Sequence, residues 1–83
     1  MKAVASKPSD IRLQRRNYRI VPLNPSVDAP ISELAVAIDQ GVSARPDLSR
    51  LDFYEVDLED GWAYVHLHDD ARVAYLVAYS GSS

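Results

Sequence analysis

The two histidines of this 83-residue chain are its residues with the widest chemical range. His66 and His68 stand two positions apart, so on a β-strand their imidazoles share one face. A nearby carboxylate such as Glu55 or Asp69 could complete a small metal chelate. Metal sites in proteins ordinarily use three or four protein ligands, however, and the chain has no further histidine and no cysteine. We therefore expect no metal and no other cofactor, with a metal site at His66, His68 and Glu55 as the alternative.

Residues that could act as nucleophiles or hold phosphate groups lack the setting that such chemistry needs. The serines fall in expected tails, loops and helix boundaries, and none lies in a Gly-x-Ser-x-Gly elbow. Three glycines leave no phosphate-binding loop. A general base at His66 paired with Glu55 is chemically feasible, but so short a chain has little depth for a cleft that excludes water. The sequence therefore predicts no catalytic residues and a protein that is not an enzyme.

The charges are divided unevenly along the chain. Residues 1–19 hold six basic residues against one acidic residue, a net charge of +5, whereas residues 20–83 hold three against eleven, a net charge of −8. A basic N-terminal arm therefore precedes an acidic body. A high density of arginine beside an aromatic residue is typical of segments that contact nucleic acid. The candidates for contact with a polyanion are Arg12, Arg15, Arg16 and Arg19.

The elements that must position these residues can be read from the hydrophobic pattern. Apolar residues between Ile31 and Val42 recur with the spacing of one helical face. Asp28 suits the N-cap and Gly41 a left-handed position after the last turn, so we expect one helix over residues 29–40, with Pro46 supporting its end. Runs rich in aromatic and β-branched residues predict strands at 51–58, 62–68 and 72–79, and a shorter strand at 17–21.

The first turn between the last three strands determines which residues share a face. A two-residue Asp60-Gly61 loop pairs Val56 with Val65 and keeps the apolar residues of both strands on one side of the sheet. A two-residue Asp-Gly loop is typical of a type I′ turn, so we expect a positive φ at Gly61.

The second turn, around residues 69–70, leaves two registers open. An even-length loop sets Ala74 and Leu76 beside Val65. An odd-length loop sets the alternate residues there, beginning with Val73. In both cases one face of the last strand stays apolar after the other face has met the helix.

The expected fold is α+β in two layers, (β)αβββ, with one helix packed on an antiparallel meander of three to four strands. Residues 1–16 form a flexible basic arm, and residues 17–80 form a single small domain in which the 17–21 strand is ordered against the body. One helix covers only one face of a sheet, so a second subunit, the N-terminal segment or a ligand must cover the other. The residues expected on that aromatic face are Phe53, Trp62, Tyr64, Val73, Tyr75 and Val77.

The order of these elements resembles one known family. A helix followed by the runs Tyr54–Gly61 and Tyr64–Asp69 looks like the αβββ pattern of PepSY-type domains, over about half of the chain. The resemblance implies a protein that is exported or attached to a membrane. This chain departs from the family in having no export signal, and in having residues 70–72 where the family has a Thr-Gly turn.

These features predict a protein that works by binding. We expect a small non-enzymatic interaction or regulatory module that associates with itself as a homodimer through the aromatic face of its sheet. The alternative is a nucleic-acid-associated protein that contacts polyanions through the basic arm. The longest apolar run, Val73–Tyr79, is far shorter than the roughly 20 residues of a membrane helix, and the N-terminus lacks the apolar region of a secretory signal. We therefore expect a cytoplasmic protein without membrane contact.

Overall fold

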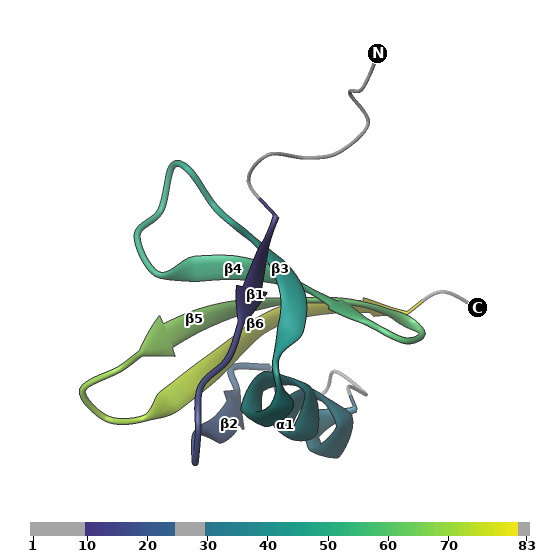
Figure 1. Ribbon diagram of the computed structural model, residues 1–83, viewed down its shortest axis with the longest axis horizontal. Coiled ribbons are helices and arrows are strands. Elements are labelled where there is room, and N and C mark those ends of the chain that lie inside the picture. Colours follow the sequence, from purple (N-terminus) through teal and green to yellow (C-terminus); the bar gives the residue numbers. More distant parts are fainter. Residues whose placement is uncertain (1–9, 25–29, 82–83) are drawn as a thin grey trace.

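The computed structural model describes residues 10–24 and 30–81, which form one α-helix and one six-stranded sheet (Figure 1). This part of the chain is α+β, as the sequence predicts. No helix in these two ranges has the length and apolar character that a membrane span requires. In chain order the elements are β1 (Ile11–Leu13), β2 (Arg19–Pro22), α1 (Ile31–Gln40), β3 (Val42–Pro46), β4 (Phe53–Leu58), β5 (Gly61–His68) and β6 (Val73–Gly81).

The sheet is larger than the sequence predicts and is mixed. The strand order is β1-β3-β4-β5-β6-β2, in which every neighbouring pair is antiparallel except β2 and β6, which are parallel. The predicted meander is present as β4, β5 and β6. The expectation of three to four antiparallel strands is wrong because β3 and β1 extend one edge of the meander and β2 joins its other edge in parallel.

Strand β3 was missed because it follows the helix directly and ends in a proline. The register places Pro46 opposite Tyr54 of β4. The next residue, Asp47, donates its backbone N–H to the carbonyl oxygen of Phe53 at 2.9 Å. In an antiparallel strand, alternate residues donate to the same neighbouring strand. The nitrogen of Pro46 therefore points away from β4, and the pairing with β4 needs no N–H at this residue. A proline at this position ends the strand without interrupting the ladder.

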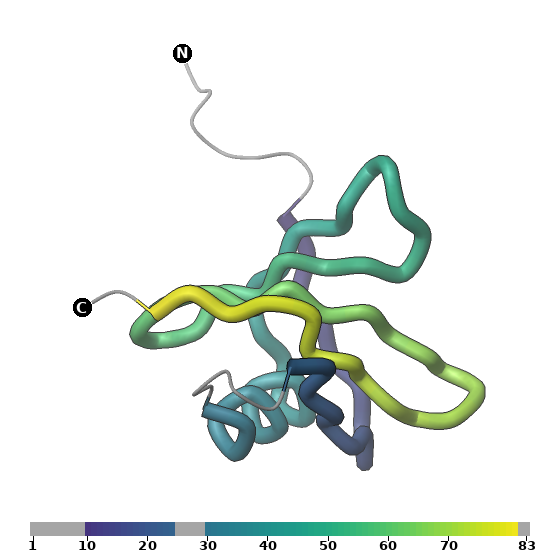
Figure 2. The backbone as a smooth tube through the Cα atoms, turned by 180° about the vertical axis from the view of Figure 1, so that it is seen from behind, coloured from purple at the N-terminus to yellow at the C-terminus, as the bar shows by residue number. Residues whose placement is uncertain are grey.

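The sheet is curled. Its two edge strands are joined by only five residues, 14–18. Six Cα steps of about 3.3–3.6 Å span at most about 20–22 Å, whereas the edges of a flat six-stranded sheet would lie about 24 Å apart. The link also turns, with Asn17 at a φ of 63°. The sheet therefore bends to bring its edges together, and in Figures 1 and 2 β1 runs steeply across the direction of β5 and β6.

The core lies between α1 and the sheet face that turns toward it (Figure 1). The predicted helix is confirmed over Ile31–Gln40, and its Leu34 and Ile38 are each only 1% exposed. The expected N-cap, Asp28, lies outside the described residues. Gly41 follows the last turn with a φ of 104°. The buried residues of the core are Leu13, Ile20, Leu34, Ile38, Ala44, Val56, Ala63, Val65, Leu67, Ala74 and Leu76.

The first hairpin has the predicted faces but a different register. Leu58 pairs with Gly61 and Val56 with Ala63, so the two-residue loop is Glu59-Asp60 rather than Asp60-Gly61. The shift keeps the same residues on the core face because it preserves the two-residue alternation. The expected positive φ at Gly61 is wrong. Gly61 is needed for another reason: a Cβ there would lie 2.2 Å from the carbonyl oxygen of Ser80.

The second hairpin follows the even-length alternative. His68 pairs with Val73 across the four residues 69–72, and Leu76 lies opposite Val65. A register shift then occurs between Tyr64 and Val65, which leaves Val77 as the extra residue of β6. Beyond this irregularity the strand presents its other set of side chains to the core. Tyr79 consequently lies opposite Ala63 and packs against the core, where simple alternation would have placed Ala78.

The predicted boundary between arm and domain is wrong for residues 11–16. Ile11–Leu13 forms β1, and Leu13 is 1% exposed in the core. The expectation that residues 17–21 order against the body is confirmed, since Arg19–Pro22 pairs with β6. Residues 1–9, the rest of the expected arm, lie outside the described residues.

Candidate functional site

The sheet face opposite α1 carries a row of ring side chains from three neighbouring strands. Phe53 of β4 stacks on His66 of β5, with ring centroids 4.0 Å apart and planes at 8°. The ring of Tyr64 lies 5.4 Å from that of Phe53, with the two planes tilted by 33°. His68 meets His66 at 4.3 Å and the edge of Tyr75 at 4.9 Å. The alternation of each strand therefore assembles these rings into one continuous ladder.

Most of the predicted face residues lie in or beside this ladder. Phe53, Tyr64 and Tyr75 are half-buried ring members, and Trp62 of β5 is 39% exposed. Val73 pairs with His68 and is 4% exposed, yet it is not part of the core cluster. Val77 is the exception, because it sits at the register shift of β6. The described N-terminal strands extend the sheet at its edges and do not lie across this face.

The loop between β3 and β4, residues 47–52, is held to this face by the carboxylate of Asp47. Its Oδ1 accepts the backbone N–H of Ser49 at 2.9 Å and the Ser49 hydroxyl at 2.7 Å. Its Oδ2 accepts the hydroxyl of Tyr64. These bonds, that from Tyr64 first, lower the pKa of Asp47 to about 2. The same bond raises the pKa of Tyr64. Arg50 adds a contact over the Phe53 ring, 5.2 Å from its centroid.

This hydrogen-bonded loop exposes two leucines. Leu48 is 91% exposed and Leu51 is 86% exposed, the highest values among the large hydrophobic side chains of the described residues. In Figure 1 the loop projects from the upper left of the molecule, away from α1. The sequence-based interpretation missed the pair, because it placed Leu51 at the start of a strand over 51–58. The signal that could have found it is the Asp47-x-Ser49 spacing, which is typical of an Asx turn.

Carboxylates of the same sheet face are paired with one arginine. Arg45 of β3 donates from Nε to Glu55 at 2.8 Å and from Nη2 to Asp57 at 2.7 Å, and lies 3.7 Å from Asp10. The hydrogen bonds to Asp57 and then to Glu55 raise the pKa of Arg45. The guanidinium therefore offsets much of the negative charge beside the aromatic ladder.

The residues named as metal-ligand candidates are only partly brought together. His68 Nε2 and His66 Nδ1 lie 3.2 Å apart. Glu55 lies opposite Tyr64 and binds Arg45. Within residues 10–24 and 30–81, no group of three or more His, Cys, Asp or Glu side chains is arranged to hold a metal ion.

The four arginines proposed for polyanion contact have different surroundings. Arg15 donates to Asp69 at 3.2 Å, and Tyr18 donates to the same carboxylate. The Tyr18 bond, followed by that from Arg15, lowers the pKa of Asp69. Arg16 and Arg19 are exposed. The ion pair of this segment therefore forms at the β5–β6 turn, between Arg15 and Asp69.

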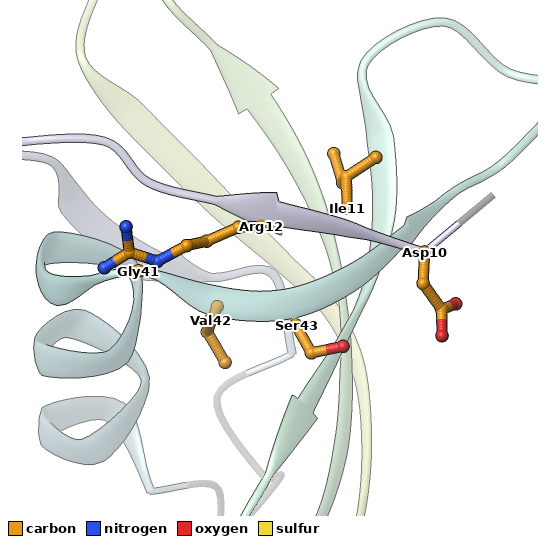
Figure 3. Close-up of a pocket in the computed structure, with 6 residues that line it drawn as sticks. All are labelled: Asp10, Ile11, Arg12, Gly41, Val42 and Ser43. Carbon is orange, nitrogen blue, oxygen red and sulfur yellow. The ribbon is translucent and has the colours of Figure 1, made fainter. Parts of the chain in front are cut away.

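The fourth arginine, Arg12, lies over the end of the helix at a shallow depression of about 410 Å³ (Figure 3). Its guanidinium donates to the carbonyl oxygen of Gln40 at 2.6 Å. An added Cβ on Gly41 would lie 2.4 Å from the Nε of Arg12. This arginine therefore caps the C-terminus of α1, where a cation is favourable. The depression also contains residues of β1 and β3, and its single carboxylate is Asp10.

In comparisons with known proteins, no family model, no curated protein and no solved structure matches the chain. The resemblance to PepSY-type domains is thus without support from a family match. The candidate functional site therefore rests on the geometry of the aromatic ladder, the β3–β4 loop and the groups around them.

Proposed function

We propose that the protein is a non-enzymatic interaction module that associates with a second copy of itself. The proposed contact surface consists of the aromatic ladder and the β3–β4 loop. The observation that carries the proposal is the exposure of Leu48 and Leu51, 91% and 86%, on a loop held by hydrogen bonds.

The two leucines can be buried in a complex without reorganisation of the loop. Burying a leucine side chain completely contributes about 1.5–3 kcal/mol, so the pair offers about 3–6 kcal/mol to a complex. The loop is already ordered through Asp47, and little conformational entropy is lost when a partner covers it. Contiguous exposed apolar groups on an ordered segment are typical of protein interfaces.

A second copy is the partner that the arrangement favours. The loop and the ladder are neighbours, since Arg50 covers Phe53 and Tyr64 bonds to Asp47. A two-fold axis beside them would set the leucines of each copy on the aromatic face of the other, as an isologous interface requires. Arg45 offsets the charge of Glu55 and Asp57, which reduces repulsion between two such faces.

Sedimentation equilibrium tests the proposal. The wild-type chain is compared with the double variant Leu48→Ser/Leu51→Ser, from micromolar to near-millimolar concentrations. A loss of about 3 kcal/mol or more corresponds to dimerisation weakened by about 100-fold or more. The matched control is Val36→Ser, which removes another exposed hydrophobic side chain, 54% exposed, on α1. The control should dimerise like the wild type.

Two results would contradict the proposal. A wild-type chain that stays monomeric over the whole concentration range excludes self-association. Dimerisation that the double variant leaves unchanged excludes the loop as the contact. Unfolding monitored by circular dichroism should show that both variants keep the wild-type stability, because exposed positions away from caps and cores change it by about 0.5 kcal/mol or less.

The alternative function, contact with nucleic acid through the basic segment, has fewer groups to use. Arg12 and Arg15 are engaged with the helix end and with Asp69, although Arg12 is exposed, as are Arg16 and Arg19. Binding through phosphate contacts weakens steeply with salt, whereas an apolar interface does not. Salt-dependent binding of an RNA or DNA oligonucleotide, reduced by Arg16→Ala, would favour this alternative.

A further inference from the structure

The two histidines face each other at a distance suited to joint metal coordination. His66 Nδ1 and His68 Nε2 are 3.2 Å apart. Two imidazole nitrogens that each lie about 2.0–2.1 Å from one tetrahedral ion are about 3.3–3.4 Å apart. The separation between the two nitrogens thus matches the bite of a chelate. Each lone pair must point about 35° away from the line between the nitrogens to meet one tetrahedral ion.

Neighbouring rings hold this pair in place. Phe53 stacks on His66 at 4.0 Å and 8°, and Tyr75 meets His68 edge-on at 4.9 Å. The strand fixes the spacing of the two residues, since positions two apart in β5 lie on one face. The pair is therefore preorganised, and a ligand does not have to collect it from separate loops.

The surroundings favour a cation. His66 and His68 line an open depression of about 360 Å³ together with Asp52, Asp69 and Asp70. Asp69 is occupied by Arg15 and Tyr18, but the depression as a whole carries three carboxylates. It includes two rings of the aromatic ladder and Asp52 of the β3–β4 loop, so it borders the surface proposed for self-association.

We propose that His66 Nδ1 and His68 Nε2 chelate a divalent transition-metal ion of the zinc, nickel and copper class, with water completing its coordination. Imidazole suits these ions, whereas magnesium and calcium prefer oxygen ligands. In the metal-free protein the two nitrogens share one hydrogen-bonded proton, and the ion takes the place of that proton. When the metal binds, the imidazole that donated the proton carries it on its other ring nitrogen. With two protein ligands, binding is modest and reversible.

Isothermal titration of the full chain, free of any affinity tag, with zinc chloride tests the site. The chain has only these two histidines and no cysteine, so no other imidazole or thiol competes. We expect saturable binding that weakens about tenfold or more in His66→Gln and in His68→Gln alike, because the second imidazole binds intramolecularly. Nickel should bind in the same way, and magnesium should not bind.

The matched control is Glu59→Gln, which removes one carboxylate at the opposite end of β5. This variant should bind zinc like the wild type. His66 contributes to the ring stack, so circular dichroism must confirm that each histidine variant is folded. A second measurement uses the wild-type chain alone: the imidazole NMR signals of both histidines should change together during the zinc titration.

Three outcomes would overturn the assignment. The first is a wild-type chain that does not bind zinc at millimolar concentration. The second is zinc binding that persists in both histidine variants, which would assign the ion to carboxylates. The third is zinc binding that depends on one histidine only, which would show a single ligand and no chelate. Loss in both variants with an unchanged Glu59→Gln control supports the two-histidine site.

Discussion

Replacing Gly41 with alanine tests how the helix joins β3. Gly41 has a φ of 104°, a region that L-amino acids rarely adopt. A Cβ at this position would also lie 2.4–2.6 Å from three guanidinium atoms of Arg12. The substitution therefore strains the backbone and displaces the side chain that donates to the carbonyl oxygen of Gln40.

The expected loss of stability can be summed from these contributions. Backbone strain at a glycine-only conformation costs about 1–3 kcal/mol. The lost hydrogen bond of an exposed arginine adds about 0.5–1.5 kcal/mol. The reduced freedom of alanine in the unfolded chain offsets about 0.4–1 kcal/mol. The net loss is about 2 kcal/mol, which lowers the Tm of a domain of this size by about 8–16 °C.

Urea unfolding followed by circular dichroism measures this loss, and the background variant Arg12→Ala separates its two causes. In that background Gly41→Ala should lower the free energy of unfolding only through backbone strain, because no guanidinium remains to be displaced. A Gly41→Ala variant within about 0.5 kcal/mol of the wild type would refute the strain argument. An equal cost in both backgrounds would refute the role of Arg12.

Two further predictions concern charged groups of the β3–β4 loop and of the sheet beside it. The carboxyl of Asp47 should titrate with a pKa of about 2 in the folded protein, so its contribution to stability is present above the unfolded value and is lost as the pH falls from about 4 to 2. Tyr64→Phe should raise this pKa toward 3.8, as followed by carbon NMR of the side chain, and an unchanged value would contradict the assigned cause. Arg45→Met leaves Glu55 and Asp57 side by side without their cation and should cost about 1 kcal/mol after solvent screening. High salt should reduce that difference in urea unfolding, and a variant as stable as the wild type would show that the network contributes nothing.

The sequence was sufficient for elements whose pattern is local. The helical spacing from Ile31 to Ile38 predicts α1, because a 3.6-residue period admits one buried face. The two-residue alternation predicts β4, β5 and β6 and correctly separates Val56 and Val65 from the residues of the aromatic ladder. This separation survives a change in the loop register, since a shift that preserves the alternation leaves every side chain on its face.

The sequence was insufficient wherever a pairing or a contact depends on distant residues. Strand β1 is three residues long and has no pattern of its own, so only its pairing with β3 defines it. The parallel pairing of β2 with β6 requires the whole sheet to curl. The shift between Tyr64 and Val65 depends on packing across two strands, and it moves Val77 out of its predicted role.

For the candidate site, the sequence determined which chemistry is present, and the tertiary structure decided where it can act. The alternation in β5 sets His66 and His68 on one face, and composition alone excludes a third imidazole or a thiol. The spacing along the chain could not show which carboxylate lies beside the two histidines. Glu55 was a candidate, but in the folded chain it binds Arg45 of β3. The exposure of Leu48 and Leu51 likewise follows from a loop closed by Asp47 and Tyr64, 17 residues apart. Local periodicity fixes the face on which a side chain lies, whereas its neighbours come from strands that only the folded chain brings together.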